Sequence, residues 1–346
     1  MEYRHLGPSG LKVSLLSYGN WITSASDQDQ TLSNDVIARC LEYGINFFDT
    51  AEVYASGKAE EILGNSLKAL KVPREDVVVS TKVFWRSREG KEPNSQGLSR
   101  KKVIESLNKS LSRLQLDYAD IVFAHRYDHQ TPMEEICRAF DWVINNGKAF
   151  YWGTSEWTAD QVMEAYAICE KYNLHKPIAE QPQYNMLHRQ RFELDYELLF
   201  EKYKMGTTVW SPLAGGILTG KYVKGIEKGT RADKAIANVR KFKELHSEEN
   251  KEKGERVFRE LGEIAFQLDC SLAQLALAWV LKNKDVSTAI FGVSRVQQVD
   301  DNVKAIQVYK KITPEIEERI DHILGNKPEA SINFRTWEPR PSRRLR

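Results

Sequence analysis

The segment Ser17-Tyr18-Gly19-Asn20-Trp21, at the end of the first apolar run, decides between two folds. Eight short apolar runs, each followed by a stretch with helical periodicity, favour either an open doubly wound sheet or a closed barrel. An open sheet that binds a dinucleotide would carry the pattern G-x-G-x-x-G directly after its first strand. Residues 17–21 lack that pattern, so the sequence predicts an α/β protein that forms a closed (β/α)₈ TIM barrel.

The eight runs are rich in β-branched and aromatic residues, which is typical of parallel strands buried on both faces. They lie at 15–18, 46–49, 77–81, 120–124, 149–153, 178–181, 207–210 and 288–291. Between them, apolar residues recur at spacings of three and four, as in amphipathic helices. Two of these helices are expected at 100–113 and 272–281, with Ser99 and Ser271 as their N-caps.

Two further features frame the predicted barrel. Proline and glycine within residues 6–10 predict an N-terminal hairpin that plugs one end of the barrel. After the seventh strand, the charged stretch from Tyr222 to Arg256 predicts a long loop on the active face. We expect one domain over residues 1–328. The arginine-rich, proline-containing segment 329–346 is expected to be a basic, disordered tail.

Composition argues against several classes of function. The chain has 346 residues with 50 lysines and arginines against 48 acids, a balance unlike that of nucleic-acid-binding proteins. Four cysteines without metal-site spacing predict no metal and free thiols in a reducing compartment. The N-terminal segment lacks a signal-peptide core, and the longest apolar stretch, near 272–281, is shorter than a bilayer span. We therefore expect a cytoplasmic protein without membrane insertion.

Four polar residues stand at the ends of consecutive predicted strands. Asp49 closes the second strand, Tyr54 lies in the loop after it, Lys82 follows the third strand and His125 follows the fourth. Taken singly, each residue type is more often structural or solvated than catalytic. The carboxyl ends of barrel strands meet on one face, so the four together predict a site there.

These residues and their neighbours resemble the aldo-keto reductases, and most closely the branch of the voltage-gated potassium channel β-subunits. The resemblance extends from Tyr3 to about Pro328 and is carried by the runs NFFDTAEVY (46–54), YWGTS (151–155), WSPLAGG (210–216) and GKY (220–222). The family's catalytic set is Asp, Tyr, Lys and His, which implies these roles for Asp49, Tyr54, Lys82 and His125. The channel branch carries asparagine where this chain has His125, and this departure favours an ordinary reductase.

The chemistry of carbonyl reduction explains these residue types. Reduction requires a hydride on carbon and a proton on oxygen, and a free tyrosine, with a pKa of about 10, is a weak acid at neutral pH. We expect Lys82 to lower the pKa of Tyr54, and Asp49 to keep Lys82 charged and oriented. Tyr54 is then the general acid, and His125 polarises the substrate carbonyl.

The resemblance further implies that a nicotinamide cofactor lies extended across the strand ends. The implied binding positions are Asn20, Trp21, Asp49, His125, Ser155, Glu156, Gln181, Trp210, Ser211, Pro212, Leu213, Ala214, Gly215, Lys221, Arg231, Gly292, Ser294, Gln298, Asp301 and Asn302. Tyr184 is expected to stack on the nicotinamide ring. Glu156 departs from the channel branch, where an arginine follows the serine. Lys221 and Arg231 favour NADP(H) over NAD(H), because a 2′-phosphate requires such cations.

Three interpretations of function follow. The first is an NADPH-dependent reductase of small-molecule aldehydes or ketones, with pocket walls from Trp21, Trp85, Tyr127 and Trp157. The second is a regulatory subunit that binds NADP(H) as a redox sensor and docks on a channel; the branch also implies a possible homo-tetramer. A long N-terminal inactivation segment would favour this second interpretation, but the barrel is expected to begin near Tyr3. The third, an inert scaffold, conflicts with the intact catalytic set.

Overall fold

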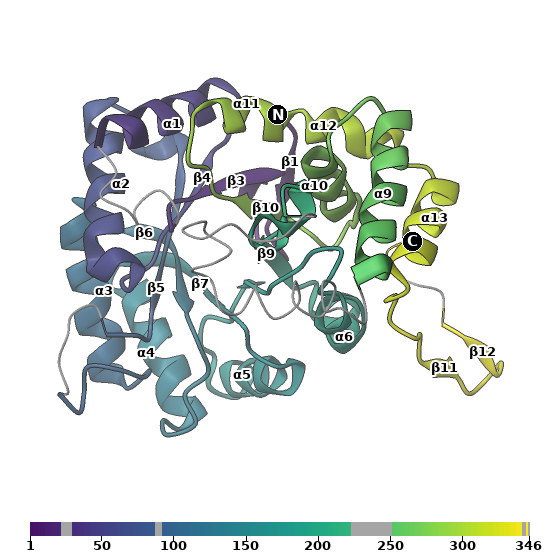
Figure 1. The fold of residues 1–346 in the computed structure, drawn as a ribbon. Helices are drawn as coiled ribbons and strands as arrows, with labels where there is room; N and C mark the ends of the chain where they lie inside the picture. Colours follow the sequence, from purple (N-terminus) through teal and green to yellow (C-terminus); the bar gives the residue numbers. More distant parts are fainter. Residues whose placement is uncertain (22–29, 87–91, 223–250, 341–343, 345–346) are drawn as a thin grey trace.

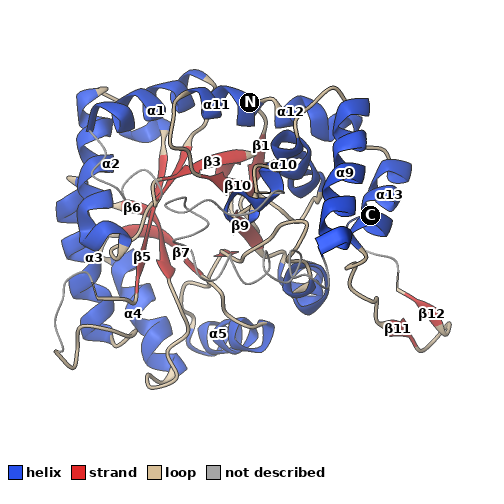
Figure 2. Cartoon of the chain, viewed as in Figure 1, coloured by secondary structure: helices blue, strands red, loops and turns tan. Residues whose placement is uncertain are grey.

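The computed structural model describes residues 1–21, 30–86, 92–222, 251–340 and 344. At its centre, parallel strands close into a barrel in the order β10-β3-β4-β5-β6-β7-β8-β9. Their bounds are β3 Leu16–Gly19, β4 Phe47–Asp49, β5 Val78–Val83, β6 Ala119–Ala124, β7 Ala149–Thr154, β8 Ala179–Glu180, β9 Gly206–Trp210 and β10 Thr288–Phe291. Every predicted run overlaps one of these strands, so the predicted (β/α)₈ barrel is confirmed. Figure 2 shows the strands surrounded by helices.

The helices lie outside the barrel (Figure 1). They are α1 Gln30–Glu42, α2 Lys58–Ala69, α3 Arg100–Leu114, α4 Met133–Asn145, α5 Ala159–Tyr172, α6 Glu197–Tyr203, α9 Lys251–Gln267, α10 Leu272–Lys282, α11 Gln297–Val303, α12 Ala305–Val308 and α13 Pro314–Leu324. Consecutive helices from α1 to α5 pack against one another. The predicted caps are confirmed, because Ser99 and Ser271 accept hydrogen bonds from the backbone N–H groups of Lys102 and Gln274.

The strands are buried on both faces because one face fills the barrel and the other packs under the helices. Phe47 and Val78 belong to the cluster inside the barrel, whereas the next residues, Phe48 and Val79, belong to the outer core. This alternation follows from the period of two in a strand. It explains why the runs read as continuous apolar segments.

The N-terminal hairpin closes one end of the barrel, as predicted. Its strands, β1 Tyr3–His5 and β2 Lys12–Ser14, are antiparallel. Leu6 and Val13 join the cluster inside the barrel. Gly7 has φ +59°, and a Cβ there would lie 2.4 Å from the carbonyl oxygen of Ile178. Glycine is therefore required where the hairpin turn touches the barrel floor.

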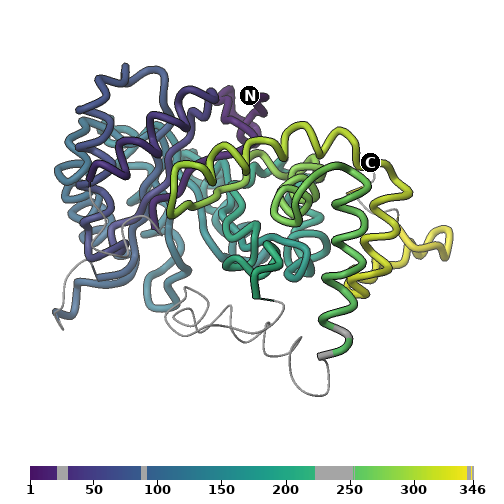
Figure 3. The backbone as a smooth tube through the Cα atoms, turned by 45° about the horizontal axis from the view of Figure 1, so that its top comes forward, coloured from purple at the N-terminus to yellow at the C-terminus, as the bar shows by residue number. Residues whose placement is uncertain are grey.

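The predicted loop at 222–256 is partly corrected. Helix α9 begins at Lys251, so the last six residues of that prediction are helical. The buried residues of this helix, Val257, Leu261 and Ile264, are spaced three or four positions apart and form one apolar face. The packing of this face stabilises α9, whose first turns lie in the charged stretch. Residues 223–250 lie outside the described part of the chain. In Figure 3, α9 runs beside α13 outside the barrel.

Among the described residues, no single helix has both the length and the apolar character to cross a membrane. The segments Gly254–Gln267 and Leu272–Lys282 pass the same test as a pair, but they are bent by 82° at their junction. Residues 275–281 of the second segment are buried within the protein.

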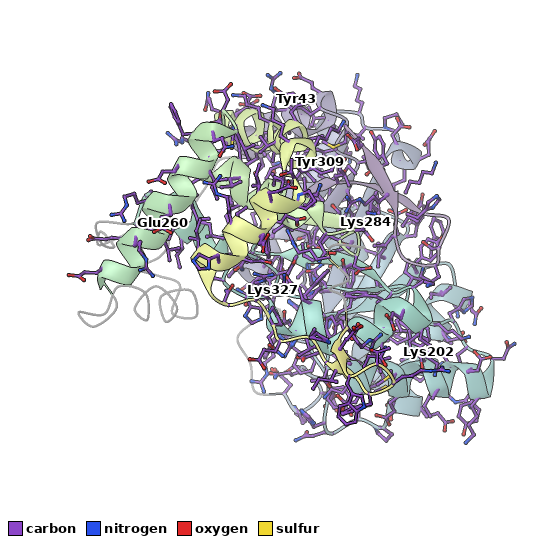
Figure 4. The ribbon with its side chains drawn as sticks, turned by 90° about the vertical axis from the view of Figure 1, so that its right-hand side faces the viewer. Tyr43, Lys202, Glu260, Lys284, Tyr309 and Lys327 are labelled. Atoms are coloured by element: carbon purple, nitrogen blue, oxygen red, sulfur yellow. The ribbon has the colours of Figure 1, made fainter. Side chains whose placement is uncertain are left out.

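The C-terminal segment differs from the predicted disordered tail. Residues 332–339 form a hairpin, β11 Ile332–Asn333 and β12 Glu338–Pro339, which projects from the body in Figure 1. Arg340 forms ion pairs with Glu197 and Glu201 of α6, and Arg344 pairs with Glu317 of α13. The predicted disorder rested on the charges within residues 329–346 alone. The acids that neutralise Arg340 and Arg344 lie far away in the sequence, so that prediction could not include them. Figure 4 turns this side toward the viewer, with Lys327 labelled where the segment leaves α13.

Candidate active site

A cavity of about 840 Å³ opens at the carboxyl ends of the strands. This volume is within the range of small-molecule and cofactor sites. The strand ends supply its floor, because Asp49 closes β4, while His125, Ser155 and Gln181 directly follow β6, β7 and β8. Loops after β4, β5 and β9 supply the walls. The location agrees with the face on which barrel enzymes place their sites.

Asp49, Lys82 and Tyr54 form one hydrogen-bonded unit at the cavity floor. The Nζ of Lys82 lies 2.5 Å from Oδ2 of Asp49, 2.8 Å from the carbonyl oxygen of Thr50 and 3.1 Å from the hydroxyl of Tyr54. Lys82 is fully buried, and all three donors of its ammonium are used. The other carboxylate oxygen of Asp49 accepts from the hydroxyl of Ser80 and from the amide of Gln181. The predicted catalytic pair is therefore held in a single orientation.

A tight turn after β4 carries Tyr54 into the cavity. Tyr54 begins a short 3-10 turn, Tyr54–Gly57, in which Ala55 and Ser56 have φ of 46° and 54°. Non-glycine residues in this left-handed region are strained, and such strain is concentrated at functional sites. The ring of Tyr54 stacks on Trp21 at 6.1 Å between centroids. The turn thus fixes the hydroxyl above Lys82.

The pKa of Tyr54 differs from the sequence-based expectation. Burial raises the pKa of Tyr54 above its ordinary value, and the nearby Lys82 opposes this shift without reversing it. Burial by itself lowers the pKa of Lys82, but Asp49 and Tyr54 together raise it above the ordinary value. The expected lowering at Tyr54 was wrong because desolvation outweighs one ammonium that is already paired with a carboxylate. At neutral pH the site holds a neutral phenol beside a charged lysine.

His125 is neutral at physiological pH. Burial, together with the positive charges of Lys82 and Arg126, holds its pKa well below the usual range. Its backbone N–H donates to Val83, and its ring lies 6.1 Å from that of Tyr54. The ring Nδ1 is buried and has no hydrogen-bond partner among the described residues. A neutral imidazole in this position can donate one N–H to an oxygen atom in the cavity.

The loop after β9 forms a backbone cradle along the cavity. Ser211, Ala214, Gly215 and Gly216 all have positive φ, between 49° and 96°. The hydroxyl of Ser211 accepts from the N–H of Gly215 at 3.1 Å. The N–H groups of Ala214 and Gly216 donate to the carbonyl oxygens of Ser211 and Leu213. The WSPLAGG run therefore forms a tight, internally hydrogen-bonded loop along the cavity wall.

Most of the predicted cofactor positions line this cavity. They are Trp21, Asp49, His125, Ser155, Gln181, Trp210, Ser211, Pro212, Leu213, Gly215, Lys221, Gly292, Ser294, Gln298, Asp301 and Asn302. The end opposite Tyr54 is built from α11 and the turn before it, where Gln298 accepts from the N–H of Ser294 at 2.7 Å. The cavity therefore joins residues separated by more than 250 positions in the sequence.

Besides Tyr184, four predicted cofactor positions do not line the cavity or are not described. The side chain of Asn20 turns away and donates to the carbonyl of Ala59. Glu156 accepts from the indole of Trp210 and pairs with Arg191, so it supports the cavity wall from behind. Ala214 is buried under its loop. Arg231 lies outside the described residues.

The prediction that Tyr184 stacks on a nicotinamide ring is wrong. Tyr184 is fully buried and stacks on Phe192 with 4.1 Å between ring centroids. Its hydroxyl donates to Glu193 and accepts from the guanidinium of Arg344. The chain turns between Gln181 and Tyr184, and that turn carries the tyrosine into the core. The aromatic side chain that lines the cavity from this side is Trp210.

The predicted aromatic walls are half correct. Trp21 and Trp85 line the cavity on either side of Tyr54 and His125. Tyr127 and Trp157 instead pack edge to face against each other, and Trp157 is fully buried. Both follow strand ends, but neither lines the cavity.

Sequence reasoning missed several residues that line the cavity. The informative ones are Arg126, Arg295 and Gln274. Arg126 directly follows the predicted catalytic residue His125, and this position could have identified it as a residue of the site. Arg295 directly follows Ser294, a predicted binding position, and adds a cation at that end. Gln274 lies in the first turn of α10, and no local pattern marks it.

The comparisons with known proteins agree with this geometry. The model of the Aldo/keto reductase family matches residues 15–324, and the chain belongs to this family of oxidoreductases. Over 335 residues it is 45% identical to a probable voltage-gated potassium channel subunit beta of Oryza sativa subsp. japonica, covering 97% of this chain and 100% of that protein. Its identity to the corresponding probable subunit of Arabidopsis thaliana is 43%, with the same coverage. A putative subunit of Schizosaccharomyces pombe is 47% identical over 329 residues, 95% of this chain and 94% of that protein.

Proposed function

We propose that this protein reduces aldehydes or ketones to alcohols with NADPH. The observation that carries the proposal is the 3.1 Å contact between the ammonium of Lys82 and the hydroxyl of Tyr54, at the floor of a cavity large enough for a cofactor. Family membership supports the reaction class. Tyr54, Lys82, Asp49 and His125 are then the catalytic residues.

The described residues fit a bound NADP(H), which when present would supply the hydride. The loop at 211–216 lines the cavity and would run alongside the pyrophosphate. Ser155 and Gln181 lie near Asp49, where polar groups could hold a carboxamide. Lys221 and Arg295 line the far part of the cavity, and their charges suit a 2′-phosphate. These cations support NADPH over NADH, and Arg231 remains a predicted contact.

Tyr54 supplies the proton. Its raised pKa keeps the phenol protonated at neutral pH, so a proton is available when negative charge develops on the carbonyl oxygen. The ammonium of Lys82 stabilises the phenolate that is left behind, and Asp49 keeps that ammonium charged and in place. His125, neutral because of burial, donates an N–H to the same oxygen and orients it. The contacts of Lys82 with Tyr54 and Asp49 are already formed, and His125 keeps a ring nitrogen, free of partners among the described residues, for the substrate oxygen.

The Tyr54→Phe variant tests the proposal. It keeps the ring stacked on Trp21 but removes the proton, so we expect kcat for a panel of aldehydes to fall by about 100-fold or more. The Kd for NADPH, followed by quenching of tryptophan fluorescence, is expected to change by less than about threefold. Turnover at the wild-type rate in this variant would overturn the assignment. Equal use of NADH and NADPH by the wild type would overturn the cofactor preference.

A second candidate function is suggested by the similar proteins. Their names describe subunits of voltage-gated potassium channels, so the chain could bind a channel in the cytoplasm as a homo-tetramer and use NADP(H) as a sensor. In the same assay, tight NADPH binding without turnover of any aldehyde would favour this candidate. The complete catalytic set favours the reductase.

A further inference from the structure

Arg126 is a cation in the cavity beside the proposed proton donor. It directly follows His125 at the end of β6, is half-buried, and lines the same cavity as Tyr54. Its Nη1 donates to the carbonyl oxygen of His125 at 2.5 Å and to the hydroxyl of Ser155 at 3.4 Å. Its charge reaches the site, because it acts on the pKa values of both Tyr54 and His125.

Among the buried and half-buried arginines that the structure describes, Arg126 differs in having few partners within the protein. Each of the others is satisfied within the protein: Arg4 donates to three backbone carbonyls, and a carboxylate pairs with each of Arg39, Arg74, Arg113, Arg189, Arg191, Arg340 and Arg344. Among the described residues, no carboxylate lies within ion-pair distance of Arg126. Its Nε and Nη2 have no acceptor there. A guanidinium has five N–H donors, so most of its hydrogen-bonding capacity is unused by the described residues.

The surroundings do not supply a counter-charge for this cation. Asp49, the acid at the same end of the cavity, is already bound to Lys82. Trp21 and Trp85 provide apolar walls around Tyr54 and His125. The substrate end of the cavity thus combines an aromatic slot, a proton donor and one guanidinium without a carboxylate. Such a guanidinium binds carboxylate and phosphate oxygens through two parallel hydrogen bonds.

We propose that Arg126 binds an anionic group of the substrate, so that the preferred substrates are aldehydes bearing a carboxylate or phosphate. The proposal rests on the carbonyl reductase function proposed above and names its substrate class. When the anion sits on Arg126, the carbonyl is directed toward Tyr54 and His125. A neutral aldehyde lacks that anchor and relies on the tryptophan walls alone.

Paired substrates test the proposal. Succinic semialdehyde is compared with butanal, and glyceraldehyde 3-phosphate with glyceraldehyde, in NADPH oxidation assays of the wild type, Arg126→Gln and Arg126→Lys. We expect the wild type to favour the anionic member of at least one pair by about 10- to 100-fold in kcat/KM, through KM. The substrate pair that shows the preference identifies the anionic group that Arg126 binds, carboxylate or phosphate. The ratio should fall to about one in Arg126→Gln and lie between these values in Arg126→Lys.

Two controls separate substrate binding from other roles. Arg295→Gln removes the other arginine that lines the cavity within the described part of the chain, on the side of α11, and should keep the wild-type substrate ratio. In Arg126→Gln, kcat/KM for butanal and KM for NADPH should stay within about threefold of wild type, which also reports a folded protein. A wild type that reduces butanal but shows no anionic preference overturns this proposal and leaves the reductase intact. If Arg126→Gln raises KM for NADPH but leaves the ratio of kcat/KM for anionic and neutral aldehydes unchanged, Arg126 binds the cofactor. That result also overturns the proposal. No turnover of any aldehyde overturns the reductase, and this proposal with it.

Discussion

At the scale of single residues, the site is organised around a fully buried ammonium. Lys82 contacts Asp49, Thr50 and Tyr54, and its charge is compensated by a carboxylate that is itself almost completely buried. A buried ion pair adds little net stability, because the desolvation of both ions offsets their attraction. Removal of one partner, however, leaves an uncompensated buried charge. The two partners therefore depend on each other for the stability of the fold.

The Lys82→Met variant should show this dependence. We expect it to lower the free energy of unfolding by about 3–5 kcal/mol, because Asp49 is left charged and unpaired in the core. The double variant Asp49→Asn with Lys82→Met should recover much of that loss, although both variants lack activity. Urea unfolding of the three proteins measures the effect. Equal stability of Lys82→Met and wild type would contradict it.

At the scale of elements, strand β8 combines two opposite environments in two residues. Ala179 faces the barrel interior, while the next residue, Glu180, is fully buried on the outer side. The carboxylate accepts hydrogen bonds from the hydroxyls of Thr154 and Tyr196 and from the N–H of Trp157. None of the described cations forms an ion pair with it, and burial raises the pKa of Glu180 to about 8. β8 thus carries a carboxyl that stays protonated at neutral pH, directly before the cavity residue Gln181.

This raised pKa makes stability depend on pH. Between the ordinary value of about 4.5 and about 8, the folded protein keeps a proton on Glu180 that the unfolded chain has lost. Because the unfolded state binds fewer protons there, the free energy of unfolding falls as the pH rises, by up to about 1.4 kcal/mol per pH unit from this group.

The Glu180→Gln variant, which cannot ionise, should show a flatter profile than wild type in urea unfolding at pH 5, 6.5 and 8. Glu318→Gln, on the exposed side of α13, is the matched control and should follow the wild type. Parallel profiles for Glu180→Gln and wild type would contradict the assignment of this titration to Glu180.

At the scale of the whole molecule, the C-terminal segment ties distant parts of the chain together. The guanidinium of Arg344 lies 3.7 Å from the ring centre of Trp279 in α10 and 3.0 Å from a carboxylate oxygen of Glu317 in α13. It also donates to the hydroxyl of Tyr184, in the loop after β8. One buried side chain near the end of the chain therefore joins two outer helices to the barrel.

Replacement of Arg344 by alanine should destabilise the fold. Glu317 would lose its ion-pair partner while its side chain remains buried, and we expect the free energy of unfolding to fall by about 3–5 kcal/mol. Arg335→Ala, which removes an exposed arginine of the β11–β12 hairpin, should change it by less than about 0.5 kcal/mol. Chemical unfolding of both variants compares them directly. Equal values would show that the C-terminal contact carries no stability.

Much of the fold could be predicted because its signals are local. Strands buried on both faces must be apolar along their whole length, so the eight runs were visible in the sequence. The caps at Ser99 and Ser271 depend only on residues within one helical turn. The grouping of the proposed catalytic residues was predictable for a geometric reason: in a parallel barrel every strand ends on the same face, which brings Asp49, Lys82 and His125 together.

The sequence by itself thus determined the barrel, its plugging hairpin and the grouping of polar residues at one mouth, because each follows from periodicity and chain direction. The tertiary structure alone decided where individual side chains point and which charges meet. Tyr184 enters the core, Arg344 finds a buried acid, and burial of Tyr54 outweighs the pull of Lys82 on its pKa. These outcomes depend on desolvation and on contacts between residues far apart in the chain. Such quantities do not exist until the chain is folded.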